Sequence, residues 1–169
     1  MCLTRTALAL LLMSLCMTSA LAQDSSAPIT VEADQLEIDQ KSGISIYQGN
    51  VRLQQQTLLL LAERLELRSE QGEISRVYAE GSPVHLEHKD PQTGSLTRAD
   101  ASRMEYRLGE GILELKGDAR LWREGEEFSG THLIYESETQ VVRAFGDPQG
   151  EESGRVRMIL QPNRGGNDE

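Results

Sequence analysis

Apolar and polar residues alternate in short stretches along most of the chain. This period-2 pattern is typical of half-buried strands, in which successive side chains point to opposite faces of a sheet. The alternating stretches are residues 29–32, 36–39, 51–54, 65–68, 104–107, 113–116 and 133–136. Glycines recur between these stretches, as turns require. The pattern predicts an all-β fold, although the apolar run at residues 58–67 also fits a helix with strand-like flanks.

The predicted strands belong to a repeated unit. Related segments begin at Ala33, Ala62, Ala101 and Gly130. The first half of the chain aligns with the second so that Ala33 matches Ala101, and the alignment slips by one position to match Arg76 with Arg143. One unit alone cannot bury its apolar face, so units of this kind stack into one continuous core. The sequence therefore predicts a β-solenoid of four related repeats of short antiparallel strands.

Alternation also predicts which side chains face the interior. These positions are Ile29, Val31, Leu36, Ile38, Val51, Leu53, Leu65, Leu67, Val84, Leu86, Met104, Tyr106, Leu113, Leu115, Leu121, Leu133 and Tyr135. Only 4% of the residues are aromatic, which favours a thin, elongated core over a compact globule. Pro83 breaks the alternation of its own strand, so we expect a bulge beside it.

A solenoid has an open sheet edge at each end, and open edges favour pairing with another chain. Residues 29–32 would form the N-terminal edge and residues 156–160 the C-terminal edge, unless residues 151–154 loop the latter strand away. The expected partner contacts are Ile29, Thr30, Val31, Val156, Met158 and Leu160. We therefore expect head-to-tail self-association.

Residues 1–22 have the features of a secretory signal peptide. A basic start at Arg5 precedes a short apolar run, and the segment ends in Ala20-Leu21-Ala22. We expect cleavage after Ala22, which removes Cys2 and Cys16 and leaves a cysteine-free secreted protein. Residues 23–162 would form one domain, and the polar residues 163–169 a disordered tail.

Charge and motif content exclude several classes of function. The chain has 17 basic and 27 acidic residues, and removal of Arg5 with the signal peptide leaves a net charge of −11. Nucleic-acid binding requires a basic surface, so that class is excluded. His85 and His88 lie three residues apart on a strand and point to opposite faces, which disfavours a metal site. No hydrolase or nucleotide-binding motif is present. We expect a non-enzymatic protein without metal or cofactor.

Five segments in collinear order resemble the LptA family, also called the OstA-like domain. They are Pro28 to Asp34, Tyr47-Gln48-Gly49-Asn50-Val51, Ala79 to Leu86, Met104 to Tyr106, and Leu115 to Leu121. The likeness extends over residues 28–160. One departure is Gln54-Gln55-Gln56-Thr57, where the family often has Gln-Gly, and it predicts the loss of a sharp turn.

The resemblance implies a twisted β-jellyroll whose apolar groove binds lipopolysaccharide in the periplasm. It also implies end-to-end copies that bridge an LptC-like inner-membrane protein and an LptD-like outer-membrane protein. The interior positions given above would line the groove, and Arg64, Arg76 and Arg143 are candidate contacts for the phosphates of lipid A. Two alternatives stay open: a structural β-solenoid that polymerises, and an LptC-like protein with a retained N-terminal anchor.

Overall fold

The computed structural model describes residues 27–147 and 155–160, which form ten strands and one turn of 3-10 helix. The predicted signal peptide and the predicted polar tail lie outside these residues. The elements are β1 (Thr30–Glu32), β2 (Gln35–Asp39), β3 (Ile44–Gln55), β4 (Leu58–Glu70), β5 (Glu73–Lys89), β6 (Leu96–Arg107), η1 (Leu108–Glu110), β7 (Ile112–Arg123), β8 (Glu126–Glu136), β9 (Val141–Phe145) and β10 (Arg157–Ile159). The all-β prediction is confirmed, and the run at residues 58–67 is strand rather than helix.

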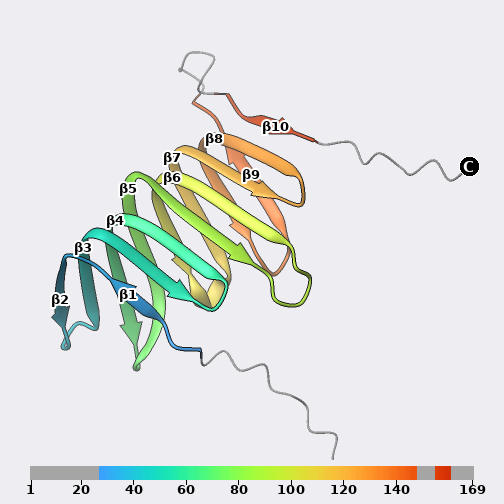
Figure 1. Cartoon of the computed structure of the whole chain (residues 1–169). Coiled ribbons are helices and arrows are strands. Elements are labelled where there is room, and N and C mark those ends of the chain that lie inside the picture. The colour runs from blue at the N-terminus through green and yellow to red at the C-terminus, as the bar shows by residue number, and fades with distance from the viewer. Residues whose placement is uncertain (1–26, 148–154, 161–169) are drawn as a thin grey trace, which may run out of the picture.

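All the strands belong to one antiparallel sheet that is not closed into a barrel. Its order is β1-β3-β4-β5-β6-β7-β8-β10, with β2 also paired to β3 and β9 also paired to β8. At each end of the stack, therefore, two short strands share one long neighbour. Figure 1 shows the long bent strands stacked along the molecule, with β1 and β2 at one end and β9 and β10 at the other.

A bulge interrupts the pairing near the middle of every long strand. The register shifts fall between Gln48 and Val51, Leu61 and Arg64, Glu80 and Val84, Asp100 and Arg103, and Lys116 and Ala119. The shift at residues 80–84 contains Pro83 and confirms the bulge expected there. Because bulges bend a strand, a column of bulges folds the whole sheet along one line.

Glycine is required at two of these bends by close approach as well as by backbone conformation. Gly49 has φ +78°, and a Cβ built there would lie 2.3 Å from the Asp34 carboxylate. Gly117 has φ +77°, and its Cβ would lie 2.8 Å from the Ser102 hydroxyl. The two glycines match in the alignment of the chain halves, as do Asp34 and Ser102, so the bend is built twice in the same way.

The structure supports the predicted alignment of the two halves of the chain. β3 and β7 have 12 residues each and begin at matching positions. β1 and β2 correspond to the two halves of β6, since Leu36 pairs with Tyr47 as Met104 pairs with Leu115. The count of four repeats stays a prediction.

The predicted match of Arg76 with Arg143 is wrong. Arg143 pairs with Ile134, whereas Glu66, the counterpart of Ile134 in the first half, pairs with Tyr78. Arg143 therefore takes the position of Tyr78, and the alignment slips further at this point than the sequence predicted.

The hairpin between β3 and β4 remains tight, so the expected loss of a sharp turn is wrong. Only Gln56 and Thr57 separate the two strands, and Gln56 has φ +50°. A non-glycine residue therefore takes the left-handed conformation that a two-residue hairpin needs.

No helix long and apolar enough to cross a membrane occurs in the described part of the chain.

Candidate functional site

Three rows of mostly apolar side chains run along the inner face of the bent sheet. Residues paired directly across antiparallel strands point to the same face, so the pairing defines each row. The first inner row is Leu36, Tyr47, Leu65, Ala79, Met104, Leu115, Leu133 and Ala144. The second is Ile38, Ser45, Leu67, Val77, Tyr106, Leu113, Tyr135 and Val142. The third is Val31, Leu53, Leu60, Leu86, Ala99, Leu121, Phe128 and Met158.

Burial along these rows is complete in the middle of the stack and is lost at the ends. Leu65, Leu115 and Leu133 are 0% exposed, whereas Leu36 and Ile38 are each 55% exposed. The end residues have the same inward orientation but a neighbouring strand on one side only. The inner face is therefore one continuous apolar surface that is left uncovered at its two ends.

The structure places nearly all of the predicted interior residues in these rows. Val51 and Val84 lie beside the bends and are 1% and 0% exposed. Ile29 precedes β1 and is 37% exposed. Sequence reasoning missed Leu60, because it lies in an unbroken apolar run without alternation. It also missed Ala79, Ala99, Ala101 and Ala119, which are all buried, because alanine gives only a weak hydrophobic signal.

Two surface hollows in the described residues lie outside these rows. The larger, of about 510 Å³, is lined by Asp118, Ala119, Arg120, Ser129, Gly130, Arg155, Val156 and Arg157. The smaller, of about 240 Å³, is lined by Pro28, Thr30, Glu32, Arg52, Gln54 and Gln56. The inner rows instead pack against one another as a hydrophobic cluster. A ligand on this face would have to replace contacts between inner side chains.

One polar contact links residues that lie on opposite sides of the bend, one on β7 and one on β8. Arg123 is the last residue of β7, and Tyr135 lies near the far end of β8, beyond the bend. The Arg123 guanidinium lies 5.1 Å from the centre of the Tyr135 ring, and its Nη1 donates a hydrogen bond to the Tyr135 hydroxyl. Burial raises the pKa of Tyr135, and the arginine charge opposes that shift. We call this pair the clasp, because it closes the inner face near the C-terminal end.

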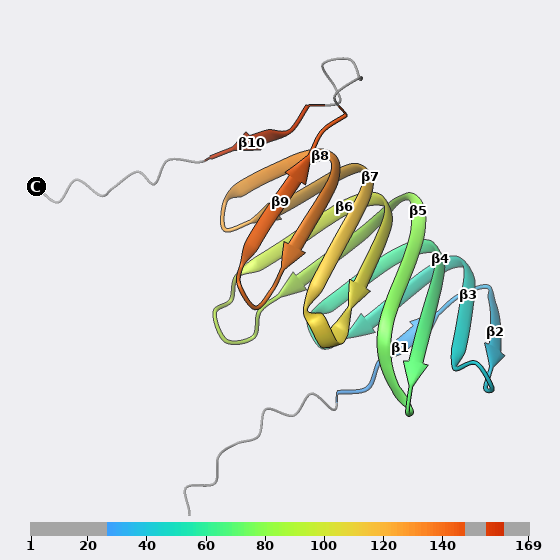
Figure 2. The ribbon, with the colours of Figure 1, turned by 180° about the vertical axis from the view of Figure 1, so that it is seen from behind.

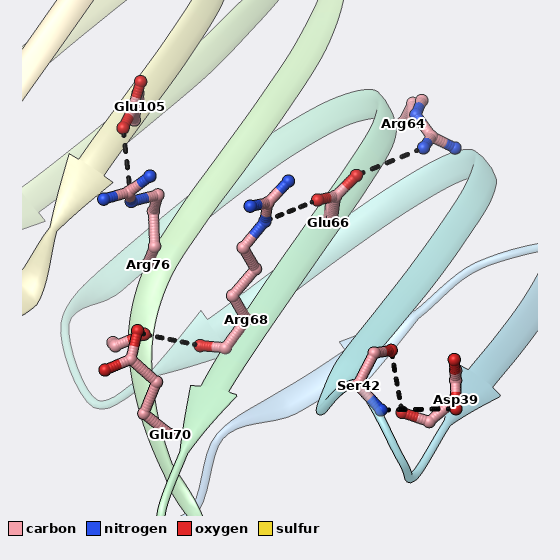
Figure 3. Close-up of polar contacts among 9 residues, drawn as sticks. Asp39, Ser42, Arg64, Glu66, Arg68, Glu70, Arg76 and Glu105 are labelled. Atoms are coloured by element: carbon pink, nitrogen blue, oxygen red, sulfur yellow. Dashed lines mark hydrogen bonds and ion pairs between the residues drawn. The ribbon is translucent and has the colours of Figure 1, made fainter.

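The outer face carries ion pairs, and the arginines proposed as phosphate contacts lie there. Arg64 and Arg68 flank Glu66, with nitrogen–oxygen distances of 3.4 and 2.8 Å (Figure 3). Arg76 lies 3.3 Å from Glu105 on β6. Arg143 is likewise paired, with Glu136. These arginines already have carboxylate partners on the outer side of the sheet.

Two of the three histidines, His85 and His132, each contact a single acidic residue on the outer face. Nδ1 of His85 lies 2.6 Å from Asp100, and Nε2 of His132 lies 2.8 Å from Glu114. A hydrogen bond from Lys116 is the main cause that lowers the pKa of Glu114; burial opposes it, and His132 adds to it. Within residues 27–147 and 155–160, no three metal-ligating side chains gather into a site.

Each end of the stack presents two edge strands, where sequence analysis predicted one. Thr30 and Val31 lie in β1 and Met158 lies in β10, and Val156 and Leu160 flank β10. β2 and β9 were missed as edges. Apart from Leu108, the large exposed apolar residues among those described all lie at the two ends: Ile29, Leu36, Ile38, Val141, Phe145, Val156, Met158, Ile159 and Leu160.

Comparison with known proteins assigns the family. The chain is 30% identical over 152 residues to the lipopolysaccharide export system protein LptH of Pseudomonas aeruginosa, covering 88% of this chain and 87% of the relative. It is 26% identical over 147 residues to LptA of Escherichia coli K12, covering 86% and 77%.

Solved structures and family models agree with these relatives. The crystal structure of LptH, described as the LptA homologous periplasmic component of the lipopolysaccharide transport device of P. aeruginosa, matches with a TM-score of 0.72 at 27% identity. The match covers 82% of this chain and 99% of that one. Residues 30–141 match the family model described as LptA/(LptD N-terminal domain) LPS transport protein. The chain therefore belongs to the LptA/LptD N-terminal domain family of lipopolysaccharide transport proteins.

Proposed function

We propose that this protein binds lipopolysaccharide in the periplasm and forms part of a bridge that carries it from the inner to the outer membrane. The observation that carries this proposal is the continuity of the three inner rows from one open edge of the sheet to the other. A track of this kind offers similar apolar contacts at every step, so a lipid sliding along it meets no deep trap. Relatives named as lipopolysaccharide export proteins support the same function.

Binding would depend on the acyl chains rather than on the phosphates. The chain has a formal net charge of −10, which opposes binding of an anionic head group. Each buried methylene contributes about 0.8 kcal/mol, so a few acyl chains supply ample affinity. Because the inner rows are packed against one another, acyl chains would have to push apart the two halves of the sheet that lie on either side of the bend. Opening the clasp between Arg123 and Tyr135 would be one such step.

The remaining parts of the proposal follow from the sequence. Residues 1–22 would direct secretion and be cleaved after Ala22, which leaves residues 23–162 as the transport domain and 163–169 as a polar tail. The processed protein would act without catalysis. At its two ends it would join further copies of itself, an LptC-like protein at the inner membrane and an LptD-like protein at the outer membrane.

A second candidate function is a structural filament with a dry core. The observation in its favour is that Leu65, Leu115 and Leu133 are fully buried within a cluster formed by the protein's own side chains. In that case the inner rows would stabilise the fold, and the open ends alone would have a function. The two candidates differ in whether lipid reaches the inner face.

Site-specific photo-crosslinking distinguishes the candidates. A photoreactive residue is placed at Tyr106 in the second inner row or at its neighbour Glu105, which lies on the outer face beside Arg76. The two positions are both half-buried, which makes them a matched pair. With purified lipopolysaccharide, we expect crosslinks at Tyr106 and not at Glu105. Equal capture at both positions would contradict the inward track, and capture at neither would favour the structural filament.

A further inference from the structure

The larger of the two surface hollows, near the C-terminal end of the stack, has a basic lining. It is formed by residues 118–120 of β7, 129–130 of β8 and 155–157 at the start of β10. Figure 2 shows β7, β8 and β10 as neighbours at one end of the stack. The lining contains Arg120, Arg155 and Arg157 and a single acidic residue, Asp118. This local excess of positive charge contrasts with the whole chain, whose formal net charge is −10.

Two of these arginines lie in one row across three paired strands. Arg120 pairs with Ser129, and Ser129 pairs with Arg157. Residues paired directly across antiparallel strands point to the same face, so all three side chains lie on the outer face. Neighbouring strands are about 4.8 Å apart, which puts the backbones at Arg120 and Arg157 roughly 10 Å apart. The short serine side chain between them leaves a space that an arginine can reach from either side.

These arginines lack the carboxylate partners that the other outer-face arginines have. Asp100 is the cross-strand neighbour of Arg120 on β6, but its carboxylate lies 2.6 Å from Nδ1 of His85. Among the described residues, no ion pair engages Arg120, Arg155 or Arg157. Like charges gathered in this way repel one another, and an anion bound between them would replace that repulsion with charge-assisted hydrogen bonds. The hollow is therefore suited to an anionic ligand.

The first half of the chain provides an internal comparison. In the alignment of the two halves, Arg52 corresponds to Arg120 and Leu61 corresponds to Ser129. Arg52 pairs with Leu61, and Leu61 pairs with His85, which takes the place of the second arginine. The same row therefore has a large apolar residue at its centre and, beyond it, a histidine that already contacts a carboxylate. The repeated backbone thus combines two arginines with a small central residue in the second half and not in the first.

We infer that this hollow binds the phosphate group of a phosphorylated sugar. Guanidinium groups hold phosphate oxygens through paired hydrogen bonds, and the Ser129 hydroxyl is a further donor at the centre of the row. The volume of about 510 Å³ lies within the range of roughly 300–1,000 Å³ that is typical of small-molecule sites, and it exceeds what a phosphate alone would fill. A soluble sugar phosphate and a phosphorylated sugar on a lipid present the same chemistry.

This site is separate from the track for acyl chains and goes beyond the proposed transport. Arg120 and Ser129 lie on the outer face, whereas their neighbours Leu121 and Phe128 belong to the third inner row. A ligand in the hollow would therefore contact the sheet from the side opposite to the inner rows. Its binding requires no parting of the packed interior and no opening of the clasp.

Isothermal titration calorimetry of the processed protein with glucose 6-phosphate tests the inference. Arg120→Gln should weaken binding by about tenfold or more, because it removes charge-assisted hydrogen bonds to the phosphate. Ser129→Leu introduces the residue that the first half has and keeps all three arginines, so it should weaken binding to a similar degree by filling the hollow. Arg52→Gln, the matched control, changes the net charge as Arg120→Gln does and should bind like the wild type. Binding should also weaken as salt is added.

The choice of probes identifies the chemistry and the source of the ligand. Glucose, which lacks a phosphate, should not bind, and glucuronate, with a single carboxylate charge, should bind more weakly than glucose 6-phosphate. Phosphatidylcholine vesicles with phosphatidic acid, compared with pure phosphatidylcholine vesicles in a sedimentation assay, present phosphate on a lipid. Binding of glucose 6-phosphate alone would assign the hollow to soluble sugar phosphates. Binding of the phosphatidic acid vesicles alone, lost in Ser129→Leu, would assign it to a lipid head group.

Several results would overturn the inference. They are the failure of every phosphate-bearing probe to bind, equal losses in Arg120→Gln and Arg52→Gln, and a Ser129→Leu variant that binds like the wild type. Tighter binding of glucuronate than of glucose 6-phosphate would overturn the assignment to phosphate, and inorganic phosphate that binds as tightly would overturn the part played by the sugar. None of the three substituted positions is fully buried, so circular dichroism should show the same fold in all the proteins. Lipid crosslinking at Tyr106 should be unchanged in these variants, which keeps this test separate from that of transport.

Discussion

The middle and the ends of this molecule have the same inward-facing pattern and opposite degrees of burial. Leu115 on β7 and Leu36 on β2 both belong to the first inner row, yet one is 0% exposed and the other 55%. The difference arises because Leu115 has a strand on each side and Leu36 has one on a single side. Alternation therefore determines which way a side chain points, and the position of its strand in the stack determines whether it stabilises this chain or contacts another.

The largest expected effect contrasts these two leucines. Leu115→Ala should lower the free energy of unfolding by about 3 kcal/mol, since it leaves a cavity in a packed interior. Leu36→Ala should lower it by less than about 1 kcal/mol, because the side chain is already half in water. Urea denaturation monitored by circular dichroism measures both.

Association of the same two variants completes the contrast. Leu36→Ala should weaken end-to-end association, whereas Leu115→Ala, assayed where it remains folded, should associate normally. Equal losses of stability in the two variants would show that the end of the stack is as well packed as the middle.

A smaller effect on the free energy of unfolding is expected at the clasp, which lies between the middle of the stack and its C-terminal end. The Arg123 side chain is 16% exposed, so its contact with the Tyr135 ring is partly shielded from water. Arg123→Ala should lower the free energy of unfolding by about 1–2 kcal/mol. Arg98→Ala, which breaks the more exposed pair with Glu87, is the control and should cost under about 1 kcal/mol.

The clasp also bears on access to the inner face. Tyr135→Phe removes the hydroxyl that accepts the hydrogen bond and keeps the ring beneath the guanidinium. If the clasp limits access, Arg123→Ala should speed lipid uptake more than Tyr135→Phe does. Unchanged uptake in both variants would show that acyl chains enter elsewhere along the stack.

The smallest expected effect is the acid dependence contributed by Glu114 on the outer face. Its pKa is lowered in the folded protein by Lys116, against the opposing effect of burial, and further by His132. A lowered folded-state pKa means that the stabilisation is fully present above the usual value of 4.5 and is lost as the pH falls through the folded-state value.

Glu114→Gln should therefore reduce stability at pH 7 by about 0.5–1 kcal/mol and should flatten its decline below pH 4.5. Thermal unfolding between pH 7 and pH 3 measures this change. Glu87→Gln, in the exposed pair with Arg98, is the control. A decline as steep in Glu114→Gln as in the wild type would assign the acid dependence to other carboxylates.

The strands and their inward faces were predictable from the sequence, because alternation directly reflects the geometry of a half-buried strand. Leu65, Leu115 and Leu133 follow from that pattern. The double edges were not predictable: residues 29–32 and 36–39 read as two successive strands, and only the tertiary pairing shows that both lie against β3. Burial of Ala79 and Ala99 was also hidden, because alanine fits where neighbouring side chains leave little room.

The repeated bend makes the cross-section of this molecule independent of its length. Each long strand crosses the same fold line at its own bulge, so every strand added to the stack meets a neighbour of matching shape. Gly49–Asn50 and Gly117–Asp118 show how closely the shape is reproduced, with φ values of +78° and +48° at the first site and +77° and +47° at the second. The cross-section of the sheet thus stays the same along the whole stack. Duplication or deletion of whole hairpins would lengthen or shorten the stack without changing the packing of its interior.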